Sequence, residues 1–497
     1  MEISWYNNRI FLVVYFVIFL LILYKIFHVP ITHDEVSTIF LAEEGTVLSI
    51  LISDGEMPNN NHILNTLLTK FSLYMFGMNP LSVRLPNLMS FIVFSAAVYR
   101  LLTNVIGLKS WLFIPASLFF VTNLYFLDFF GLSRGYALSI SFCILSISYI
   151  IPALKEMSYT KVNWSVLFAF LSVYSNFTLI YFWAIILLLA SFFYINKYKN
   201  DNLKTKHIIL FLTFIILFLV SVIPPLQNMI STNQFKYWTS NGFIDETVQP
   251  LIIHSLYGSK VLFFQFSNFF LLLFFIVTVS TVFWSFRLFL RKKNKVEVFN
   301  DPLFIVSFIL IGVITLNVLH VYVTDVPNLK NRIALFYFPL FILVLVFGLK
   351  TIQFQMNKWL KGILSVILSV LCILQFTFNF KLDSVREWSY DANTLQVVQF
   401  ISNQPGGNPT LSTDWKFNPS FYYYYRNNEL NDIVLNSYSK ELNINSGADY
   451  YYIFENDFNL FDKQYRIVKK FEQHTLLIMK YELIKKCIFD FLNFHYV

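Results

Sequence analysis

A cluster of ionisable residues follows the first long apolar run of the chain. Residues 10–24 carry only apolar and aromatic side chains, and His33, Asp34 and Glu35 come shortly after them. A carboxylate beside a substrate hydroxyl can take its proton while the oxygen attacks an electrophile. Asp34 and Glu35 are therefore candidate catalytic residues, and Asp34 is the candidate general base.

The same stretch also matches a helix-capping motif. In "THDE", Thr32 would be the N-cap and Glu35 would reach back to the backbone N–H of Thr32. Such a cap stabilises a helix by about 1 kcal/mol. Capping explains Thr32 and Glu35 but does not require Asp34 beside them, so the sequence leaves both interpretations open.

Basic side chains recur at the ends of other apolar runs. Arg84, Arg134, Lys330 and Arg332 are predicted on the same membrane face as the acidic pair. Charged groups at membrane depth are unfavourable unless they pair or line a watery cavity, so this gathering indicates a cavity at the outer leaflet. Cations suited to a phosphate, together with a carboxylate base, are typical of a transferase.

The composition indicates that a membrane-embedded fold must position these residues. Of 497 residues, 56% are hydrophobic, 19% aromatic and 13% charged, whereas soluble domains have about 45–50% apolar and about 25% charged residues. The net charge of +8 arises from Lys and Arg in short loops, which indicates membrane topology rather than nucleic-acid binding. Cys143, Cys372 and Cys487 are far apart and predict neither a disulfide framework nor a metal clip.

Eleven apolar runs approach the length that crosses a hydrocarbon core of about 30 Å. They cover residues 10–27, 85–102, 111–129, 136–151, 164–174, 177–195, 208–224, 261–283, 303–323, 333–349 and 362–378. With a cytoplasmic N-terminus, eleven spans place every dense Lys and Arg cluster in the cytoplasm and the C-terminal tail outside, as the positive-inside rule requires.

Two details of this topology depend on particular runs. The first run has no small-residue cleavage site after it, so we expect a retained span that also targets the protein to the plasma or inner membrane. The fifth and sixth runs are either two spans or one helix broken at "SNFT". A single helix would invert the sidedness of everything downstream.

The chain divides by composition into two predicted domains. Residues 1–380 form the transmembrane domain, with a long first external loop at 30–84, and residues 381–497 form a small extracytoplasmic α/β domain. Within the second domain we predict a helix at 394–402, a turn at 404–409 and a strand in 449–455. The aromatic run at 421–427 suits core packing better than sugar stacking.

Motifs for nucleotides and metals are missing from the sequence. It contains no GxxxxGK[ST] loop and no GxGxxG after a strand. His33, His62, His254 and His320 have no ligand spacing such as HExxH, so no metal site is predicted. We expect no required cofactor, and the sequence leaves dependence on a divalent metal open.

Four segments carry a resemblance to a known family. They are "HDEVSTIFLAEEG", the stretch from "NNNHILN" to "VRLPN", "LSRGYALSISFCILS" and "NRIALFYFPLFIL". In order and spacing they resemble motifs of the C-type (GT-C) polyprenyl-phosphate-sugar-dependent glycosyltransferases, which are related to protein O-mannosyltransferases and bacterial aminoarabinose transferases. His62 is followed by Ile63 and Leu64 where the family has prolines, and Tyr136 stands where some members carry a second acid.

The resemblance implies a reaction and roles for these residues. A sugar carried on a polyprenyl phosphate would pass, with inversion, to the hydroxyl of an extracytoplasmic glycan, lipid or protein, with Asp34 as the base. Arg134, Lys330 and Arg332 would bind the donor phosphate. His33, His62, Arg84 and Tyr136 are weaker substrate-binding candidates. The sequence identifies neither the sugar, nor the acceptor, nor the oligomeric state.

Two other functions fit many spans with buried charge. One is a transporter or flippase of lipid-linked or ionic substrates, and the other is a non-enzymatic scaffold of an envelope glycan-assembly complex. Transporters commonly have duplicated halves and need ionisable groups near the membrane midplane. This chain has no detectable repeat and keeps nearly all its charges at span ends, with Asp128 the closest exception.

Overall fold

The computed structural model describes residues 2–54, 60–200, 205–232, 242–256, 267–292, 295–324, 326–352, 357–404, 408–427, 433–461 and 464–481. Cys487 and part of the predicted turn at 404–409 lie outside the described residues. The chain forms two compact units. The first, here the bundle unit, comprises Met1–Ile26 and Thr38–Phe380. The second, here the sheet unit, comprises Phe27–Ser37 and Lys381–Val497.

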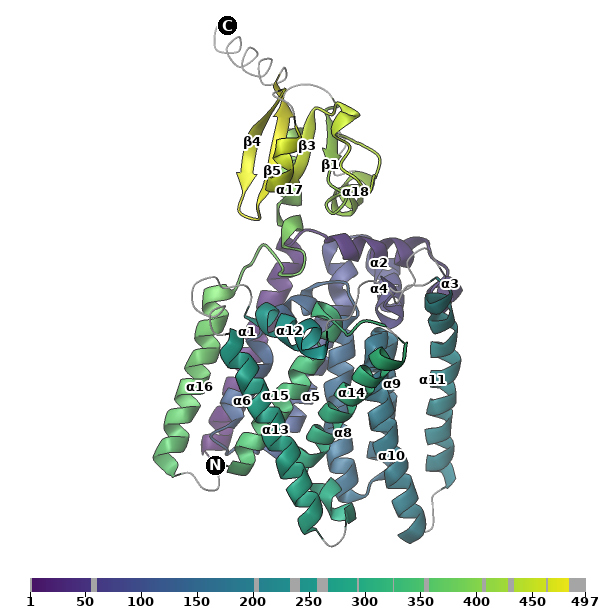
Figure 1. Cartoon of the computed structure of the whole chain (residues 1–497), viewed down its shortest axis with the longest axis vertical. Helices are drawn as coiled ribbons and strands as arrows, with labels where there is room; N and C mark the ends of the chain where they lie inside the picture. The colour runs from purple at the N-terminus through teal and green to yellow at the C-terminus, as the bar shows by residue number, and fades with distance from the viewer. Residues whose placement is uncertain are drawn as a thin grey trace. The chain divides into compact units, whose positions relative to one another are not determined.

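Long helices dominate the bundle unit (Figure 1). Continuous apolar runs form helices in a bilayer because each backbone N–H and C=O is then satisfied within its own segment. In chain order the α-helices are α1 (Glu2–His28), α2 (His33–Glu44), α3 (Val47–Ile52), α4 (Ile63–Phe76), α5 (Pro80–Val105), α6 (Phe113–Val121), α7 (Leu124–Asp128), α8 (Tyr136–Glu156), α9 (Tyr159–Ser175), α10 (Ile180–Asn200), α11 (Thr205–Ser231), α12 (Gln249–Ser255), α13 (Ser267–Arg291), α14 (Pro302–Thr324), α15 (Tyr337–Ile352) and α16 (Lys358–Asn379).

Shorter helical turns connect several of these helices. The 3-10 turns that matter below are η2 (Phe129–Gly131), η3 (Phe177–Leu179) and η7 (Asn331–Ala334), and η4 (Ile244–Val248) is a π-helical turn. The π geometry at η4 is notable because such turns are rare and concentrate at functional sites.

The predicted fold class is confirmed, and in the described residues each predicted apolar run coincides with a helix or a bent pair of helices, whereas residues 261–266 of the eighth run lie outside the described residues. Among the described residues, eight helices are long and apolar enough to cross a membrane, and a bent pair raises this number to nine. The remaining two predicted spans correspond to α9, with 17 residues, and α15, with 16 residues. The chain is thus a multi-pass helical membrane protein.

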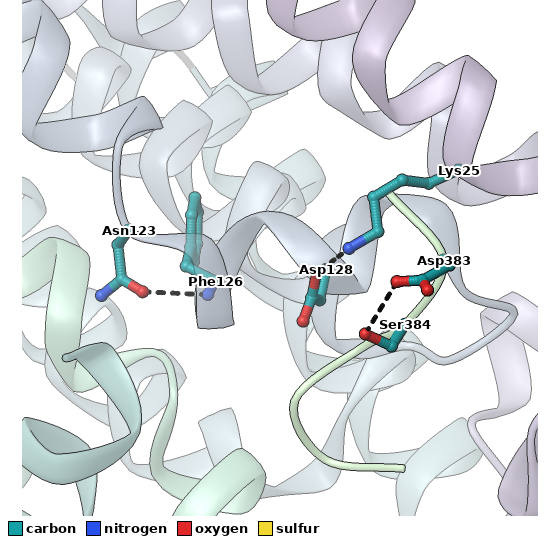
Figure 2. Close-up of polar contacts among 6 residues, drawn as sticks. All are labelled: Lys25, Asn123, Phe126, Asp128, Asp383 and Ser384. Carbon is teal, nitrogen blue, oxygen red and sulfur yellow. Dashed lines mark hydrogen bonds and ion pairs between the residues drawn. The ribbon is translucent and has the colours of Figure 1, made fainter. Parts of the chain in front are cut away.

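One predicted span is not a single straight helix. The run at 111–129 folds as α6 and α7, with a bend of 59° between Phe113–Val121 and Leu124–Gly131. Asn123 lies at the bend, and its side-chain oxygen accepts a hydrogen bond of 3.1 Å from the backbone N–H of Phe126 (Figure 2). This side chain caps a new helix inside an apolar run and thereby turns the chain.

The fifth and sixth predicted spans are two separate helices. Helix α9 ends at Ser175, η3 follows, and α10 begins at Ile180 and packs against α9. The side chain of Asn176 accepts a hydrogen bond of 3.3 Å from the N–H of Thr178 and caps the turn between them. Of the two alternatives, two separate helices and one broken helix, the first is therefore correct.

Burial separates central from peripheral helices of the bundle unit. Helix α8 packs against α5 and α9, and 78% of its most apolar 18-residue stretch is buried. The corresponding share is 6% for α13 and for α16. The side chains of α13 and α16 are apolar and exposed, as expected of helices that face lipid.

In its described residues from Lys381 onward, the sheet unit has a five-stranded sheet and the α-helices α17 and α18 (Figure 1). Its strand order is β2-β1-β3-β5-β4, with β1 parallel to β2 and β3 and with β5 antiparallel to β3 and β4. The elements are η9 (Ser389–Asn393), α17 (Thr394–Ser402), β1 (Thr410–Thr413), α18 (Asn418–Arg426), β2 (Val434–Leu435), η10 (Ile444–Ser446), β3 (Tyr450–Phe454), η11 (Glu455–Leu460), β4 (Tyr465–Phe471) and β5 (Thr475–Lys480).

Aromatic and aliphatic side chains fill the core of the sheet unit. Tyr451, Ile453, Leu476 and Ile478 form a buried cluster between neighbouring strands. The predicted helix at 394–402 coincides with α17, and the predicted strand lies at β3.

The aromatic run at 421–427 lies on α18. Phe421, Tyr423 and Tyr424 are buried, whereas Tyr422 and Tyr425 are exposed. Core packing therefore accounts for three of these five rings.

Candidate active site

The two carboxylates of the acidic pair have different surroundings at the start of α2. Glu35 is fully buried, and its Oε2 accepts hydrogen bonds of 3.0 Å from both the backbone N–H and the hydroxyl of Thr32. This is the return bond of a capping box. Asp34, in the preceding position of the chain, keeps 9% of its surface exposed. The geometry gives Glu35 the capping role and leaves Asp34 as the better candidate for chemistry.

His33 connects the start of α2 to the rest of the sheet unit. Its backbone N–H donates to Oδ2 of Asp391 at 2.8 Å, and its Nδ1 lies 2.7 Å from the carbonyl oxygen of Lys416. A carbonyl can only accept, so Nδ1 carries the proton of this bond. The imidazole also meets the ring of Trp415 edge-on at 5.9 Å between centroids. His33 is thus held at both its backbone and its ring.

Asp391 was not recognised in the sequence and is the third carboxyl group of this region. It is 1% exposed, and burial raises its pKa well above the ordinary value of Asp. The charges of Asp34 and Glu35 raise the pKa of Asp391 further, whereas the bond from His33 lowers it. No local sequence signal marks Asp391, because acidic residues are common in polar segments of this kind.

Arg134 is a buried residue in the turn between η2 and α8. Its Nη1 donates to the hydroxyl of Thr38 at 3.2 Å and to the carbonyl oxygen of Asn60 at 3.3 Å, and its Nη2 contacts the side-chain oxygen of Asn60. Thr38 lies one helical turn after Asp34 in α2. Arg134 is 1% exposed, so much of its hydrogen-bonding capacity is directed at the protein itself.

His62 and Tyr136 come together beside Gly135. Their rings meet edge-on at 4.8 Å between centroids, and the Nδ1 of His62 lies 3.0 Å from the carbonyl oxygen of Ser175. A Cβ at Gly135 would lie 2.0 Å from that same oxygen and 2.7 Å from Cβ of His62. Only glycine fits between these groups, which explains its place in "SRGY".

Arg84 is fully buried in α5. Its Nη1 donates to the carbonyl oxygen of Ile26, in the last turn of α1, at 2.8 Å. A guanidinium at a helix C-terminus satisfies an otherwise unpaired carbonyl and suits the helix dipole. This contact gives Arg84 a structural role.

Lys330 and Arg332 are the most accessible of the predicted phosphate-binding residues. Lys330 is exposed and immediately precedes η7, and Arg332 lies within η7 and is half-buried. Asn331 between them has a φ of 52°, in the left-handed region that asparagine tolerates. Lys330 and Arg332 are separated by a single residue on a short turn, so both can approach the same anion.

A buried carboxylate that the sequence reading missed fixes the segment before Lys330. Oε2 of Glu246, in η4, accepts from the backbone N–H of Asn328 at 3.2 Å and from its side-chain Nδ2 at 3.1 Å. The hydroxyl of Thr247 donates to the carbonyl oxygen of Leu329 at 2.5 Å. Glu246 is 3% exposed. The adjacent acids Asp245 and Glu246 in "GFIDETVQP" were the available signal.

Lys25 and Asp128 form a buried ion pair between α1 and α7. The ammonium nitrogen lies 2.6 Å from Oδ1 of Asp128, with side-chain exposures of 7% and 5% (Figure 2). Lys25 also lies 5.6 Å from the ring centroid of Phe380. The pairing explains how Asp128 is tolerated at the end of the predicted span 111–129. It could not be predicted from the sequence because the partners are far apart in the chain.

An apolar cavity of about 740 Å³ lies within the bundle unit. Its walls come from α6, α12, α13, α14, α15 and α16 together with residues of η4. Most lining side chains are hydrocarbon, such as Leu251, Ile314 and Leu364, and Thr247 and Tyr337 are among the few polar ones. Such a volume is typical of a pocket for one small-molecule ligand or part of a lipid.

The predicted site residues therefore fall into two sets. His33, Asp34 and Glu35 belong to the sheet unit, whereas Arg84, Arg134, His62, Tyr136, Lys330 and Arg332 belong to the bundle unit. The structure brings His62 and Tyr136 into contact and groups the acids with Asp391. Within the described part of the chain, no group of three or more His, Cys, Asp or Glu side chains could hold a metal ion.

Comparisons with known proteins give a likeness in fold. No family model and no curated protein matches the chain. Two matching solved structures are of ArnT from Cupriavidus metallidurans. The apo form has 11% identity and a TM-score of 0.46, over 95% of this chain and 97% of that one. The form bound to undecaprenyl phosphate has 10% identity and a TM-score of 0.48, over 96% and 98%.

Proposed function

We propose that the protein is a membrane glycosyltransferase that moves a sugar from a polyprenyl phosphate to an acceptor hydroxyl on the extracytoplasmic side. The observation that carries this proposal is the apolar cavity, whose wall is continuous in sequence with the basic turn at Lys330 and Arg332. Tyr337 and Phe338 line the cavity at the start of α15, directly after η7. A ligand with a hydrocarbon chain and an anionic head suits this combination.

The donor lipid supplies both features. Isoprenoid groups pack against Leu251, Ile314 and Leu364 in place of bilayer hydrocarbon, so close packing rather than removal from water favours their binding. Arg332 and Lys330 bind the phosphate, and the guanidinium can do so through two parallel N–H bonds. Arg134 has a supporting role in the bundle unit, because its bonds to Thr38 and Asn60 already occupy much of its donor capacity.

The sugar transfer is an inverting displacement. Asp34 takes the proton of the acceptor hydroxyl while the oxygen forms a bond to the anomeric carbon. The bond between that carbon and the phosphate oxygen breaks, and its electron pair stays on the phosphate. Arg332 and Lys330 stabilise the charge that grows on the leaving group. No nucleotide is needed because the activated bond is already present in the donor.

Accessibility distinguishes the two acids in this scheme. A catalytic carboxylate can have one oxygen bonded to the protein, but its other oxygen must reach the substrate hydroxyl. Asp34 retains exposed surface, whereas Glu35 is fully buried and accepts two bonds from Thr32. Glu35 therefore caps and orients α2, and Asp34 acts as the base.

A reconstituted assay tests the proposal. Purified protein in liposomes is given an undecaprenyl phosphate that carries a radiolabelled sugar, with and without a membrane extract as the source of acceptor. We expect acceptor-dependent formation of undecaprenyl phosphate together with labelled product. Movement of the intact labelled lipid between leaflets without formation of undecaprenyl phosphate would instead establish the flippase alternative.

A further inference from the structure

The sheet unit holds the backbone on the N-terminal side of the acidic pair. The N–H of Ile31 donates to the hydroxyl of Tyr424 at 2.9 Å, and the carbonyl oxygen of Ile31 accepts from the hydroxyl of Ser420 at 2.5 Å. Tyr424 and Ser420 both lie on α18 and are buried. Both polar groups of one residue are thus fixed by the same helix.

A second part of the sheet unit holds the residue that directly precedes Asp34. Asp391, in η9, accepts the backbone N–H of His33 through Oδ2, and the carbonyl of Lys416 accepts the ring Nδ1 proton of His33. The first N–H groups of a helix have no partner within the helix, so an external acceptor sets the direction in which the helix starts. Asp391 is that acceptor for α2.

The placement of Asp391 is unfavourable for stability. It is buried beside Asp34 and Glu35, and its Oδ1 has no hydrogen-bond partner among the described residues. A buried acid near two others destabilises the folded state unless it is protonated. Residues that reduce stability in this way are commonly retained for function.

We propose that Asp391 is a positioning residue that fixes the amino end of α2 and thereby the side chain of Asp34. This inference rests on the proposed role of Asp34 as the base. It assigns a task to the C-terminal part of the sheet unit, from Lys381 onward, which supplies no residue that acts directly on the substrate in the proposed reaction. The carboxyl of Asp391 acts through the backbone of His33, and its hydrogen bond rather than its charge carries the effect.

Three variants of the full-length protein test this role. Asp391→Ala removes the acceptor of the His33 bond, and Asp391→Asn keeps an acceptor oxygen without a charge. Glu455→Ala is the matched control, because it removes a carboxylate of the same unit that pairs with Lys470 and His474. For each variant, kcat and KM for the labelled donor are measured, together with amide hydrogen exchange of the peptide that covers residues 31–37.

For Asp391→Ala we expect faster exchange at residues 31–37, an unchanged KM for the donor and a fall in kcat of about 10- to 100-fold, as misplaced catalytic groups produce. Asp391→Asn and Glu455→Ala should resemble the wild type in both measurements. An Asn variant as impaired as the Ala variant, or an Ala variant with unchanged exchange and kcat, would overturn the proposal. Faster exchange in Asp391→Ala with full transfer by Asp34→Asn would instead reject Asp34 as the base.

Discussion

The acidic and the basic candidate residues are held by different kinds of structure. The segment Phe27–Ser37 belongs to the sheet unit, where side chains of η9 and α18 bond its backbone. The cations belong to the bundle unit, at the ends of its helices. In the proposed mechanism, the proton-accepting residue and the phosphate-binding residues are therefore held by different sets of contacts. Changes in the sheet unit should therefore act on kcat, and changes in the bundle unit should act on donor binding.

A second difference exists among the cations themselves. Arg84 and Arg134 are buried, whereas Lys330 beside η7 is exposed and Arg332 within η7 is half-buried. The buried arginines, like the buried acids, are held in place by hydrogen bonds to neighbouring groups. The accessible pair remains the better match for an exchangeable phosphate.

The largest effect in the bundle unit is expected at Arg332. A hydrogen bond to a charged group contributes about 1.5–3 kcal/mol, so Arg332→Ala should raise the Kd for undecaprenyl phosphate about 10- to 100-fold. Arg332→Lys should have a smaller effect because it loses only the bidentate geometry. Arg291→Ala, at the exposed end of α13, is the control. Binding of the labelled lipid to protein in nanodiscs measures each Kd, and an unchanged Kd for Arg332→Ala would remove Arg332 from the site.

The next largest effect concerns the cavity. Leu364 on α16 lines it, whereas Val366 on the same helix is 63% exposed and does not. Leu364→Trp should weaken the binding of undecaprenyl phosphate by about tenfold, because the larger side chain fills space that the lipid chain would occupy and overpacking is unfavourable by about 1–3 kcal/mol, and should leave geranyl phosphate unaffected. Val366→Trp should change neither affinity. Equal weakening for the short and the long lipid would show that the cavity does not hold the chain.

A smaller effect is expected from the connection between η4 and the segment before Lys330. Glu246→Ala and Asn328→Ala should each reduce donor affinity, because Glu246→Ala releases both hydrogen bonds and Asn328→Ala releases the one from the side-chain Nδ2. In a double-mutant cycle their coupling energy should be about 0.5–3 kcal/mol, as found for contacting residues. Strict additivity of the two changes in donor binding would show that the contact does not position Lys330 and Arg332.

The smallest effect is a change in the pH dependence of stability. The folded-state pKa of Asp391 is raised above its ordinary value of 3.8. Its proton therefore stabilises the folded state below that value, and this contribution is lost as the pH rises through the raised pKa. Asp391→Asn does not titrate, so at neutral pH it should unfold at a slightly higher temperature than the wild type. The difference should vanish near pH 4 in thermal scans of the full-length protein, and a constant difference would contradict the raised pKa.

The sequence predicted the helices well because a bilayer demands long apolar runs. The bend at Asn123 was not predicted, because the run around it is mostly apolar and a single polar residue is enough to cap a new helix there. The helix at 394–402 followed from its apolar periodicity, and η4 has no periodicity that would predict a π-helical turn. Apolar runs and apolar periodicity within a segment predict the secondary structure of that segment.

The site was predicted less completely, and for a physical reason. Asp34 and Glu35 were visible because two acids stand beside an apolar run, and their different roles required the contacts of Thr32. Lys25, Glu246 and Asp391 were missed because each depends on a partner distant in sequence. Pairing across the fold leaves no trace in the spacing of a single sequence.

The most direct test of the central claim compares Asp34→Asn with Glu35→Gln in the labelled-sugar transfer assay, alongside protein amount and donor binding. Asn has nearly the same shape as Asp in the first turn of α2 but cannot accept the proton. We predict that Asp34→Asn is folded, binds undecaprenyl phosphate normally and transfers sugar about 10²-fold or more slowly. Glu35→Gln keeps its capping bond and should retain more activity. Near-normal transfer by Asp34→Asn would contradict the account, and loss of transfer only in Glu35→Gln would move the base to the neighbouring carboxylate.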